Sequence, residues 1–343
     1  MDVKYRKVFR VIDAHTEGEP TRIVIAGLPK LEGISIIEKR MFISKNLDWL
    51  RTALLLEPRG HQDQFGTIVL PSTEKSVDYG LIFMDTGGYL DMCCHAVMGV
   101  TTALIETGVV KAREPYTNIR YETVAGIITV KAKVDGKAVK EVSVVDVPSF
   151  YIGSYELKLS NSIIPVHVAY GGNFYVIAEA RDLGVELKAR NICELIKKGI
   201  MLRDEASRQI PVNHPTQDRI DNKIKLAMII GEPELPKSNG KNIVVFGNGQ
   251  FDRSPCGTGT AARLATMYSL GLIKPGTYFI HESIINTTFK ARIIDVTKVG
   301  TYNAIIPEIT GRAFITQISD VIIDMRDPLW KGFSIPVRNY IVT

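Results

Sequence analysis

The sequence predicts an α/β protein of two similar domains, each a strand-rich, barrel-like sheet around one central helix, with the active site between the domains. Three observations support this fold class. The chain has 343 residues, enough for two domains of about 150 residues each. Short runs rich in isoleucine and valine, separated by turn residues, predict many strands. A pattern of strand, glycine turn, cysteine and buried helix is expected once in each half of the chain.

The strand pattern extends through most of the chain and is interrupted by a few helical stretches. The runs are RIVIAGL, GLIFMD, GIITVKAKV, VSVVDV, VHVAYG, FYVIAEA, KLAMIIG, NIVVFG and the long segment from ARIIDV to DVII. Residues 46–57 predict one helix. Residues 191–209 predict an amphipathic surface helix, because apolar side chains recur at helical spacing.

Two other helices are expected to be the central ones. Residues 94–107 carry no charged side chain before Glu106, so this helix should be buried on all sides. Residues 257–270 repeat the pattern with a single charge, Arg263. A glycine follows each helix in the place of a C-terminal cap.

The two cysteines that open these helices lie about half a chain length apart and set the expected domain organisation. The first domain should comprise residues 1–148 and contain Cys93, with the C-terminal segment 320–343 returning to it. The second should comprise residues 149–319 and contain Cys256. A proline interrupts the strand pattern at the boundary.

Composition excludes several classes of function. Hydrophobic content of 45% and charged content of 23% are typical of a globular protein. The net charge of +5 is spread along the chain, which argues against nucleic-acid binding. No apolar run is long enough for a membrane span, and the N-terminus lacks the pattern of a signal peptide. We therefore expect a cytoplasmic protein with no membrane partner.

The pattern of cysteines in the sequence favours a reactive role over a structural one. Neither a disulfide framework nor metal-ligand spacing is present, so we expect no metal and no disulfide. A lone cysteine before a helix usually has a packing role, but Cys93 and Cys256 share one setting. A helix N-terminus binds anions and lowers the pKa of a thiol from about 8.5. Two such termini could hold one carboxylate between two activated thiols, an arrangement suited to removing and returning the α-proton of an amino acid.

Several motifs make the sequence similar to the proline racemase family over most of its length. DRSPCGTGT, the signature around the second catalytic cysteine of that family, is intact at 252–260. The first signature, M-C-G-H, is matched by MDTGGYLDMCCH at 84–95. The remaining resemblances are HTEGEPTRIV at 15–24, EPRGH at 57–61 and GGNFY at 171–175.

The resemblance implies a fold similar to diaminopimelate epimerase, a homodimer, and racemisation without any cofactor. One of Cys93 and Cys256 would remove the Cα proton as a thiolate, and the other would return a proton to the opposite face as a thiol. His95 and Asp252 would contact the amine of the substrate. The substrate carboxylate would be held by the backbone amides of Cys94, His95, Gly257 and Thr258.

Two residues depart from the family pattern. Cys94 replaces a glycine and Asp91 replaces an asparagine. The side chain at position 94 should therefore point away from the ligand, and Cys94 is expected to be a passive substitution, with a redox role beside Cys93 as the alternative.

The resemblance favours proline as the substrate. Phe65 and Phe246 match the two phenylalanines that line the ring pocket of proline racemases, and an apolar wall leaves a 4-hydroxyl group without a partner. A 4-hydroxyproline 2-epimerase is the first alternative. A trans-3-hydroxyproline dehydratase is less favoured, because such relatives typically lack one of the two cysteines. A non-catalytic ligand-binding relative, or a redox-regulated binding module built on Cys93 and Cys94, is the alternative from another class.

Overall fold

The structure is a computed structural model that describes residues 5–159, 162–217 and 222–335. The chain divides into two compact units. The first comprises Met1–Leu90, Ala96–Val142 and Arg312–Thr343, and the second comprises Asp91–His95 and Ser143–Gly311. The expected domain limits at 148/149 and 319/320 stay a prediction.

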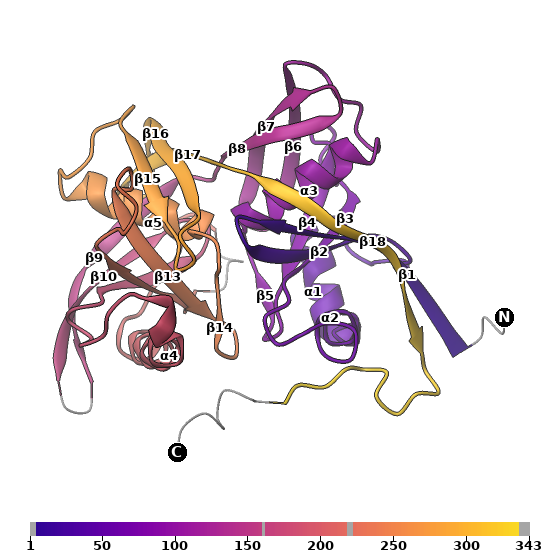
Figure 1. Ribbon diagram of the computed structural model, residues 1–343, viewed down its shortest axis with the longest axis horizontal. Helices are drawn as coiled ribbons and strands as arrows, with labels where there is room; N and C mark the ends of the chain where they lie inside the picture. Colours follow the sequence, from indigo (N-terminus) through magenta and orange to yellow (C-terminus); the bar gives the residue numbers. More distant parts are fainter. Residues whose placement is uncertain (1–4, 160–161, 218–221, 336–343) are drawn as a thin grey trace. The chain divides into compact units, whose positions relative to one another are not determined.

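In its described residues the first unit contains three helices and a strand-rich sheet (Figure 1). The helices are α1 (Ile36–Asn46), α2 (Trp49–Leu55) and α3 (Cys94–Glu106), whose first two residues count with the second unit. The strands are β1 (Arg6–Thr16), β2 (Glu19–Ala26), β3 (Gly66–Pro71), β4 (Tyr79–Met84), β5 (Tyr89–Leu90), β6 (Tyr116–Thr123), β7 (Gly126–Asp135), the first part of β8 (Ala138–Val145) and β18 (Ala313–Asp324).

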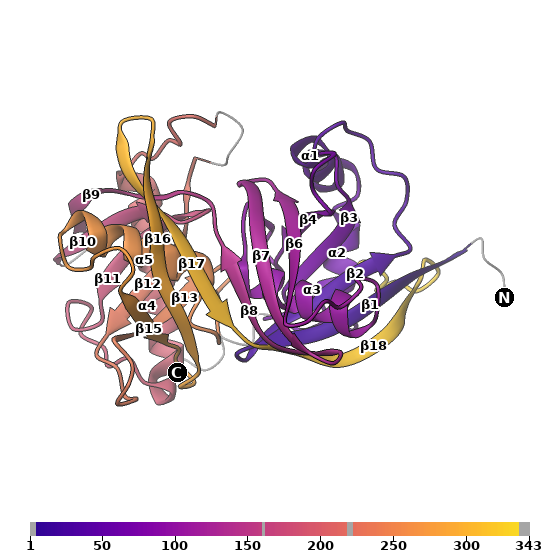
Figure 2. The ribbon, with the colours of Figure 1, turned by 90° about the horizontal axis from the view of Figure 1, so that it is seen from above.

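In this unit the last strand of the chain pairs with the first. β18 runs antiparallel to β1 over its whole length, and Figures 1 and 2 show the two strands side by side. β1 pairs antiparallel with β2, β2 parallel with β3, and β3 antiparallel with β4. β4 pairs antiparallel with β5 and parallel with β6, which forms a hairpin with β7.

Helix α3 lies inside the first unit. Its residues are buried from Cys94 to Ile105. A side chain at Gly99 would contact β1 and β2, and the Thr101 hydroxyl lies 3.1 Å from the Tyr121 hydroxyl of β6. Helices α1 and α2 bury their apolar side chains, including Ile43 and Leu54, in one cluster with the strands.

The second unit contains the helices α4 (Ile192–Gln209) and α5 (Gly257–Ser269) and a short 3-10 turn, Ala189–Asn191. Its strands are the end of β8, β9 (Ser149–Lys158), β10 (Ile163–Tyr170), β11 (Phe174–Glu179), β12 (Ile224–Gly231), β13 (Gly240–Phe246), β14 (Gln250–Phe251), β15 (Tyr278–Glu282), β16 (Thr288–Val299) and β17 (Tyr302–Gly311).

The sheet of the second unit closes on itself. Antiparallel pairs join β9 to β10, β10 to β11, β12 to β13, β15 to β16 and β16 to β17, while β11–β12 and β13–β15 are parallel. The pair β17–β9 completes the ring. Helix α5 contacts β9, β10, β11, β16 and β17, so it is the central helix of this barrel.

The two units repeat one topology, which confirms the expected fold class. The order β3–β4–β5–α3–β6–β7 of the first unit matches β12–β13–β14–α5–β15–β16 of the second, with the same parallel and antiparallel pairings. Cys93 stands immediately before α3, and Cys256 stands immediately before α5.

All four predicted helices are present, and one of them is shorter than expected. The expected helices at 94–107, 191–209 and 257–270 correspond to α3, α4 and α5. The expected helix at 46–57 is shorter, Trp49–Leu55, because the chain bends after α1. The sequence analysis missed α1, whose N-cap Ser35 accepts a hydrogen bond from the Glu38 N–H (3.2 Å).

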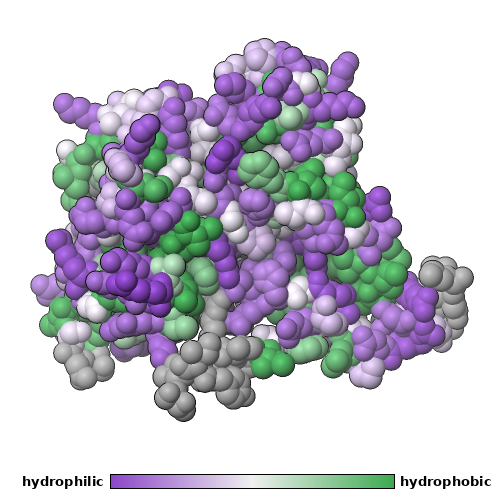
Figure 3. All heavy atoms as spheres, viewed as in Figure 1, coloured by the Kyte–Doolittle hydropathy of each residue, from purple (hydrophilic) through white to green (hydrophobic). Residues whose placement is uncertain are grey.

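The surface mixes hydrophilic and hydrophobic side chains. In Figure 3 hydrophilic residues cover most of the visible face, with hydrophobic groups between them, as is usual for globular proteins. Among the residues that the structure describes, no helix is long and apolar enough to cross a membrane.

Candidate active site

Cys256 ends a short loop that leads from β14 into α5. The Ser254 N–H donates to Asp252 Oδ1 (2.8 Å), and the Cys256 N–H donates to Ser254 Oγ (3.1 Å). The side-chain amide of Asn242 donates to the carbonyl oxygen of Pro255 (2.9 Å). These bonds fix the backbone that carries the thiol.

The backbone of Cys256 is strained. Its φ is 59° and its ψ is 104°, in a region that favours glycine. Such a conformation costs about 1–3 kcal/mol and persists only where the surroundings enforce it. A cysteine kept at this position, with a hydrogen-bonded loop to hold it, indicates a functional thiol.

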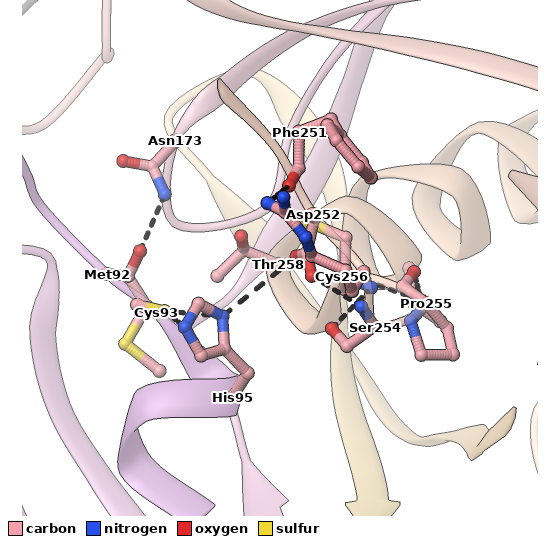
Figure 4. Close-up of polar contacts among 12 residues, drawn as sticks. Met92, Cys93, His95, Asn173, Phe251, Asp252, Ser254, Pro255, Cys256 and Thr258 are labelled. Atoms are coloured by element: carbon pink, nitrogen blue, oxygen red, sulfur yellow. Dashed lines mark hydrogen bonds and ion pairs between the residues drawn. The ribbon is translucent and has the colours of Figure 1, made fainter. Parts of the chain in front are cut away.

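Asn173 holds the segment that carries Cys93. Asn173 Nδ2 donates to the carbonyl oxygen of Met92 (2.8 Å; Figure 4), and the Asp91 N–H donates to Asn173 Oδ1 (3.2 Å). Gly172 has a φ of 87°, and a Cβ there would lie 2.7 Å from Met92 Cβ. The GGNFY motif therefore serves the site by placing the Cys93 loop.

His95 lies between Cys93 and Asp252 (Figure 4). His95 Nδ1 is 3.1 Å from Cys93 Sγ and 3.9 Å from Asp252 Oδ2. All three side chains are buried. The contact joins the loop of the first cysteine to the loop of the second.

Burial determines the protonation states of His95 and Asp252. It lowers the pKa of His95 to about 3, so the imidazole is neutral and its contact with Asp252 is polar but is not an ion pair. Burial also raises the pKa of Asp252 to about 6, against the effect of its hydrogen bonds to Ser254. At neutral pH the site thus holds a buried carboxylate, which suits a cationic ligand group.

The expected lowering of the thiol pKa at the helix N-terminus is wrong for Cys256. Burial, followed by the charge of Asp252, raises the pKa of this thiol well above its ordinary value. The Tyr175 hydroxyl and the Gly259 N–H act in the opposite direction. Desolvation and the charge of Asp252 outweigh these two hydrogen bonds, so the thiolate needs a further source of stabilisation.

Whether the side chain at position 94 points away from a ligand stays a prediction, but Cys94 itself is hydrogen-bonded within the protein. Its Sγ donates to Asp146 Oδ2 (3.1 Å), while Asp146 Oδ1 accepts from the Val147 N–H (2.7 Å). Burial raises the pKa of Cys94 well above its ordinary value and raises that of Asp146 to about 7. Cys94 is therefore a hydrogen-bonded, protonated thiol.

Cys94 also packs against the start of α5. A Cβ at Gly257 would lie 2.2 Å from Cys94 Cβ. Gly257 and Thr258 are buried, and their N–H groups belong to the first turn of the helix, where no partner exists within the helix itself. This turn is suited to a carboxylate.

The structure thus brings most of the expected site residues together in the second unit: Cys93, Cys94, His95, Asp252, Cys256, Gly257 and Thr258. Phe246 is buried in the same unit at the end of β13, whereas Phe65 is buried in the first unit. That the rings of Phe65 and Phe246 line a substrate pocket stays a prediction.

Three residues with clear roles in the site were missed. Asn173 and Tyr175 lie in the GGNFY motif, but no partner could be assigned to them from the sequence, because Met92 and Cys256 are far away along the chain. Asp146 gave a signal that was overlooked, a single acid inside the apolar run VSVVDV.

The chain is similar over most of its length to several known proteins. The family model described as proline racemase matches residues 11–334. A proline racemase of Acetoanaerobium sticklandii is 46% identical over 336 residues, covering 97% of this chain and 100% of the relative. A proline racemase of Clostridioides difficile is 45% identical over 334 residues, covering 96% and 99%. A solved hydroxyproline epimerase of Agrobacterium vitis, with bound trans-4-hydroxy-L-proline, superposes with a TM-score of 0.90 at 32% identity, over 96% of both chains.

Proposed function

The chain belongs to the proline racemase family, and on that premise we propose that it is an isomerase that interconverts L- and D-proline without a cofactor. The observation that carries the proposal is the pair of cysteines at equivalent places in a repeated topology, in a chain 45–46% identical to two proline racemases over nearly its whole length.

The reaction needs one base and one acid on opposite faces of Cα. A thiolate, Cys93 or Cys256, takes the Cα proton, so that the C–H bond breaks, an S–H bond forms and the electron pair stays on the substrate. The other thiol then gives its proton to the opposite face of Cα and becomes the thiolate. No atom is oxidised or reduced, and the enzyme ends with its two protonation states exchanged.

Backbone amides stabilise the charge that develops on the substrate. As the Cα proton leaves, negative charge spreads into the carboxylate. The N–H groups of Gly257 and Thr258 at the start of α5, and those of Cys94 and His95 at the start of α3, would receive it. Fixed donors of this kind do not need to reorganise during the reaction.

The substrate ammonium would supply a positive charge that stabilises the Cys256 thiolate. Asp252 is buried, and its negative charge raises the pKa of Cys256. A bound ammonium near Asp252 and His95 would neutralise this charge, so the pKa of the thiol would fall when substrate arrives. Activation of the thiol would then follow binding.

Proline is favoured over the hydroxylated alternatives by the two named proline racemases at higher identity. The epimerase with bound trans-4-hydroxy-L-proline, at 32% identity, keeps 4-hydroxyproline as the second candidate. In the dehydration of trans-3-hydroxyproline one of the two cysteines would have no chemical role. In a protein that only binds its ligand, neither cysteine would have one.

The test is proton exchange and optical rotation. Each enantiomer of proline, and cis- and trans-4-hydroxyproline, is incubated with the protein in D₂O. We expect both prolines to converge on the racemate with deuterium at Cα. Faster epimerisation of 4-hydroxyproline would replace the proposal by the epimerase, and absence of Cα exchange on every substrate would leave a binding protein.

Phe246→Ser should shift the preference from proline toward 4-hydroxyproline. If the ring forms part of an apolar wall, the wild-type protein discriminates against the hydroxyl by about 1–3 kcal/mol, roughly 5- to 150-fold. The measurement is the ratio of kcat/KM for the two substrates. Phe65→Ser should shift the ratio in the same direction.

Phe289→Ser is the matched control, because Phe289 is a fully buried ring of β16 in the same unit. It should lower stability without changing the ratio. An unchanged ratio in folded Phe246→Ser would mean that substrate choice depends on other residues.

We also propose a homodimer in the cytoplasm. The family resemblance supports the dimer, and Val8, Ile318 and Ile322 place half-exposed apolar side chains on β1 and β18 that a second copy could cover. All four cysteines are free thiols, which suits a reducing compartment. Sedimentation velocity should give a species with twice the mass of one chain, and a species with the mass of one chain would refute the dimer.

Recovery of the native protein from an exported fraction would refute the cytoplasmic location.

A further inference from the structure

Tyr175 on β11 presents its hydroxyl to two residues at the start of α5. The hydroxyl oxygen lies 2.6 Å from Thr258 Oγ1 and 3.5 Å from Cys256 Sγ. The side chain is 0% exposed. The phenol is therefore a fixed, water-excluded neighbour of the thiol.

Packing makes this contact specific. A Cβ at Gly259 would lie 3.1 Å from Cys256 Sγ and 3.3 Å from the Tyr175 ring. The glycine leaves the space in which ring and sulfur meet. Burial raises the pKa of Tyr175 well above its ordinary range, so the phenol is neutral at any pH at which the protein works.

We propose that Tyr175 is a positioning residue for Cys256, with a hydroxyl that donates to the thiolate and accepts from the thiol. The inference rests on the proposed function in one respect: only a two-base reaction takes Cys256 through both states. Nothing in the sequence analysis assigned Tyr175 a role.

The hydroxyl pair can reverse its hydrogen bonds when the proton moves. With Cys256 as thiolate, the Thr258 hydroxyl donates to Tyr175 and Tyr175 donates to the sulfur. With Cys256 as thiol, the S–H donates to Tyr175 and Tyr175 donates to Thr258. Both states keep two hydrogen bonds, and in each the Tyr175 hydroxyl donates one and accepts one.

The electrostatics of the site make such a donor necessary. The titratable groups around Cys256 are Asp252 from its own loop, Cys94 and Tyr175, with His95 beside Asp252. Of these, Asp252 opposes the thiolate and the Tyr175 hydroxyl favours it. Removing the hydroxyl should therefore make the Cys256 thiolate harder to form.

Tyr170 on β10 provides a matched control. It is also buried, with 1% exposed, and its ring stacks on Phe150. Among the described residues its hydroxyl has no hydrogen-bond partner. Tyr170→Phe removes the same atom from the same unit without touching Cys256.

The experiment measures alkylation of Cys256 by iodoacetamide between pH 6 and 10, without substrate, with the modified residue identified by peptide mass spectrometry. In Tyr175→Phe we expect the alkylation rate of Cys256 at pH 7 to fall about tenfold, equal to an apparent pKa rise of about one unit. The limbs of the pH profile of kcat/KM should shift to higher pH in the same variant. Tyr170→Phe should change neither.

A rate profile of Cys256 that stays within about twofold of wild type in folded Tyr175→Phe, or that changes equally in Tyr170→Phe, overturns the inference. If Tyr175→Phe does not fold, 3-fluorotyrosine at position 175 keeps the ring and gives a stronger donor. The alkylation rate at pH 7 should then rise, and an unchanged or lower rate overturns the inference. Because substrate is absent, loss of racemisation and loss of the alkylation shift are separate outcomes.

Discussion

Replacing either Cys93 or Cys256 by serine is expected to lower the rate of proline racemisation at least about 10³-fold, within the range that a positioned acid or base contributes. An alcohol is a far weaker acid than a thiol, whose pKa is about 8.5. In either variant one face of Cα would lose its acid or base. The measurement is the initial rate of optical rotation from each enantiomer.

The controls separate chemistry from folding. Cys193 lies on α4 and is partly exposed, so Cys193→Ser removes a thiol without entering the site and should retain wild-type activity. Thermal unfolding of each serine variant should stay within a few degrees of wild type. Racemisation within tenfold of wild type in either Cys93→Ser or Cys256→Ser would remove the two-thiol mechanism.

The central helices could be predicted because their information is local. A run of helical length with at most one charged residue before its last turn, between a strand and a glycine cap, identifies α3 and α5 without knowledge of their neighbours. Helix α1 was missed because its apolar residues are not gathered on one helical face, and the burial of Ile36 and Ile43 depends on the cluster that α1 forms with α2 and the sheet.

The closure of the barrel could not be predicted in the same way. It depends on β17 pairing with β9, through Ala304 and Phe150, which are far apart in the sequence. In the first unit β18 pairs with β1, and these two strands are also far apart in the sequence. Alternating apolar residues predict that such strands exist, but they do not specify the partner.

The same division holds in the site. Cys93, His95, Asp252 and Cys256 could be recognised because they stand in two short motifs. Asn173 could not be assigned, because its role lies in its bonds to a distant loop. The pKa of Cys256 was mispredicted because the helix terminus is visible in the sequence, whereas the degree of burial is not.

Gly257→Ala is expected to lower racemisation by at least about 100-fold, because a shift of about 1 Å in the first turn of α5 would misplace the carboxylate-binding amides. A Cβ there would lie 2.2 Å from Cys94 Cβ and 2.9 Å from Cys94 Sγ. Forcing this contact should also lower the free energy of unfolding by about 1–3 kcal/mol. Alanine is otherwise a better helix former than glycine, so the clash alone carries the effect.

Cys94→Gly tests whether the clash is the cause. Alone, it should keep racemisation within about tenfold of wild type, while loss of the thiol that donates to buried Asp146 lowers the free energy of unfolding by about 1–3 kcal/mol. In the double variant the nearest remaining atom to the new Cβ is the Cα of residue 94, at 3.5 Å, an ordinary contact. Racemisation should therefore recover at least about tenfold over Gly257→Ala, a coupling of more than about 1.4 kcal/mol. Additive losses in the double variant would mean that glycine is needed at position 257 for the approach of the substrate itself, and complete inactivity of folded Cys94→Gly would mean that Cys94 is one of the reacting thiols.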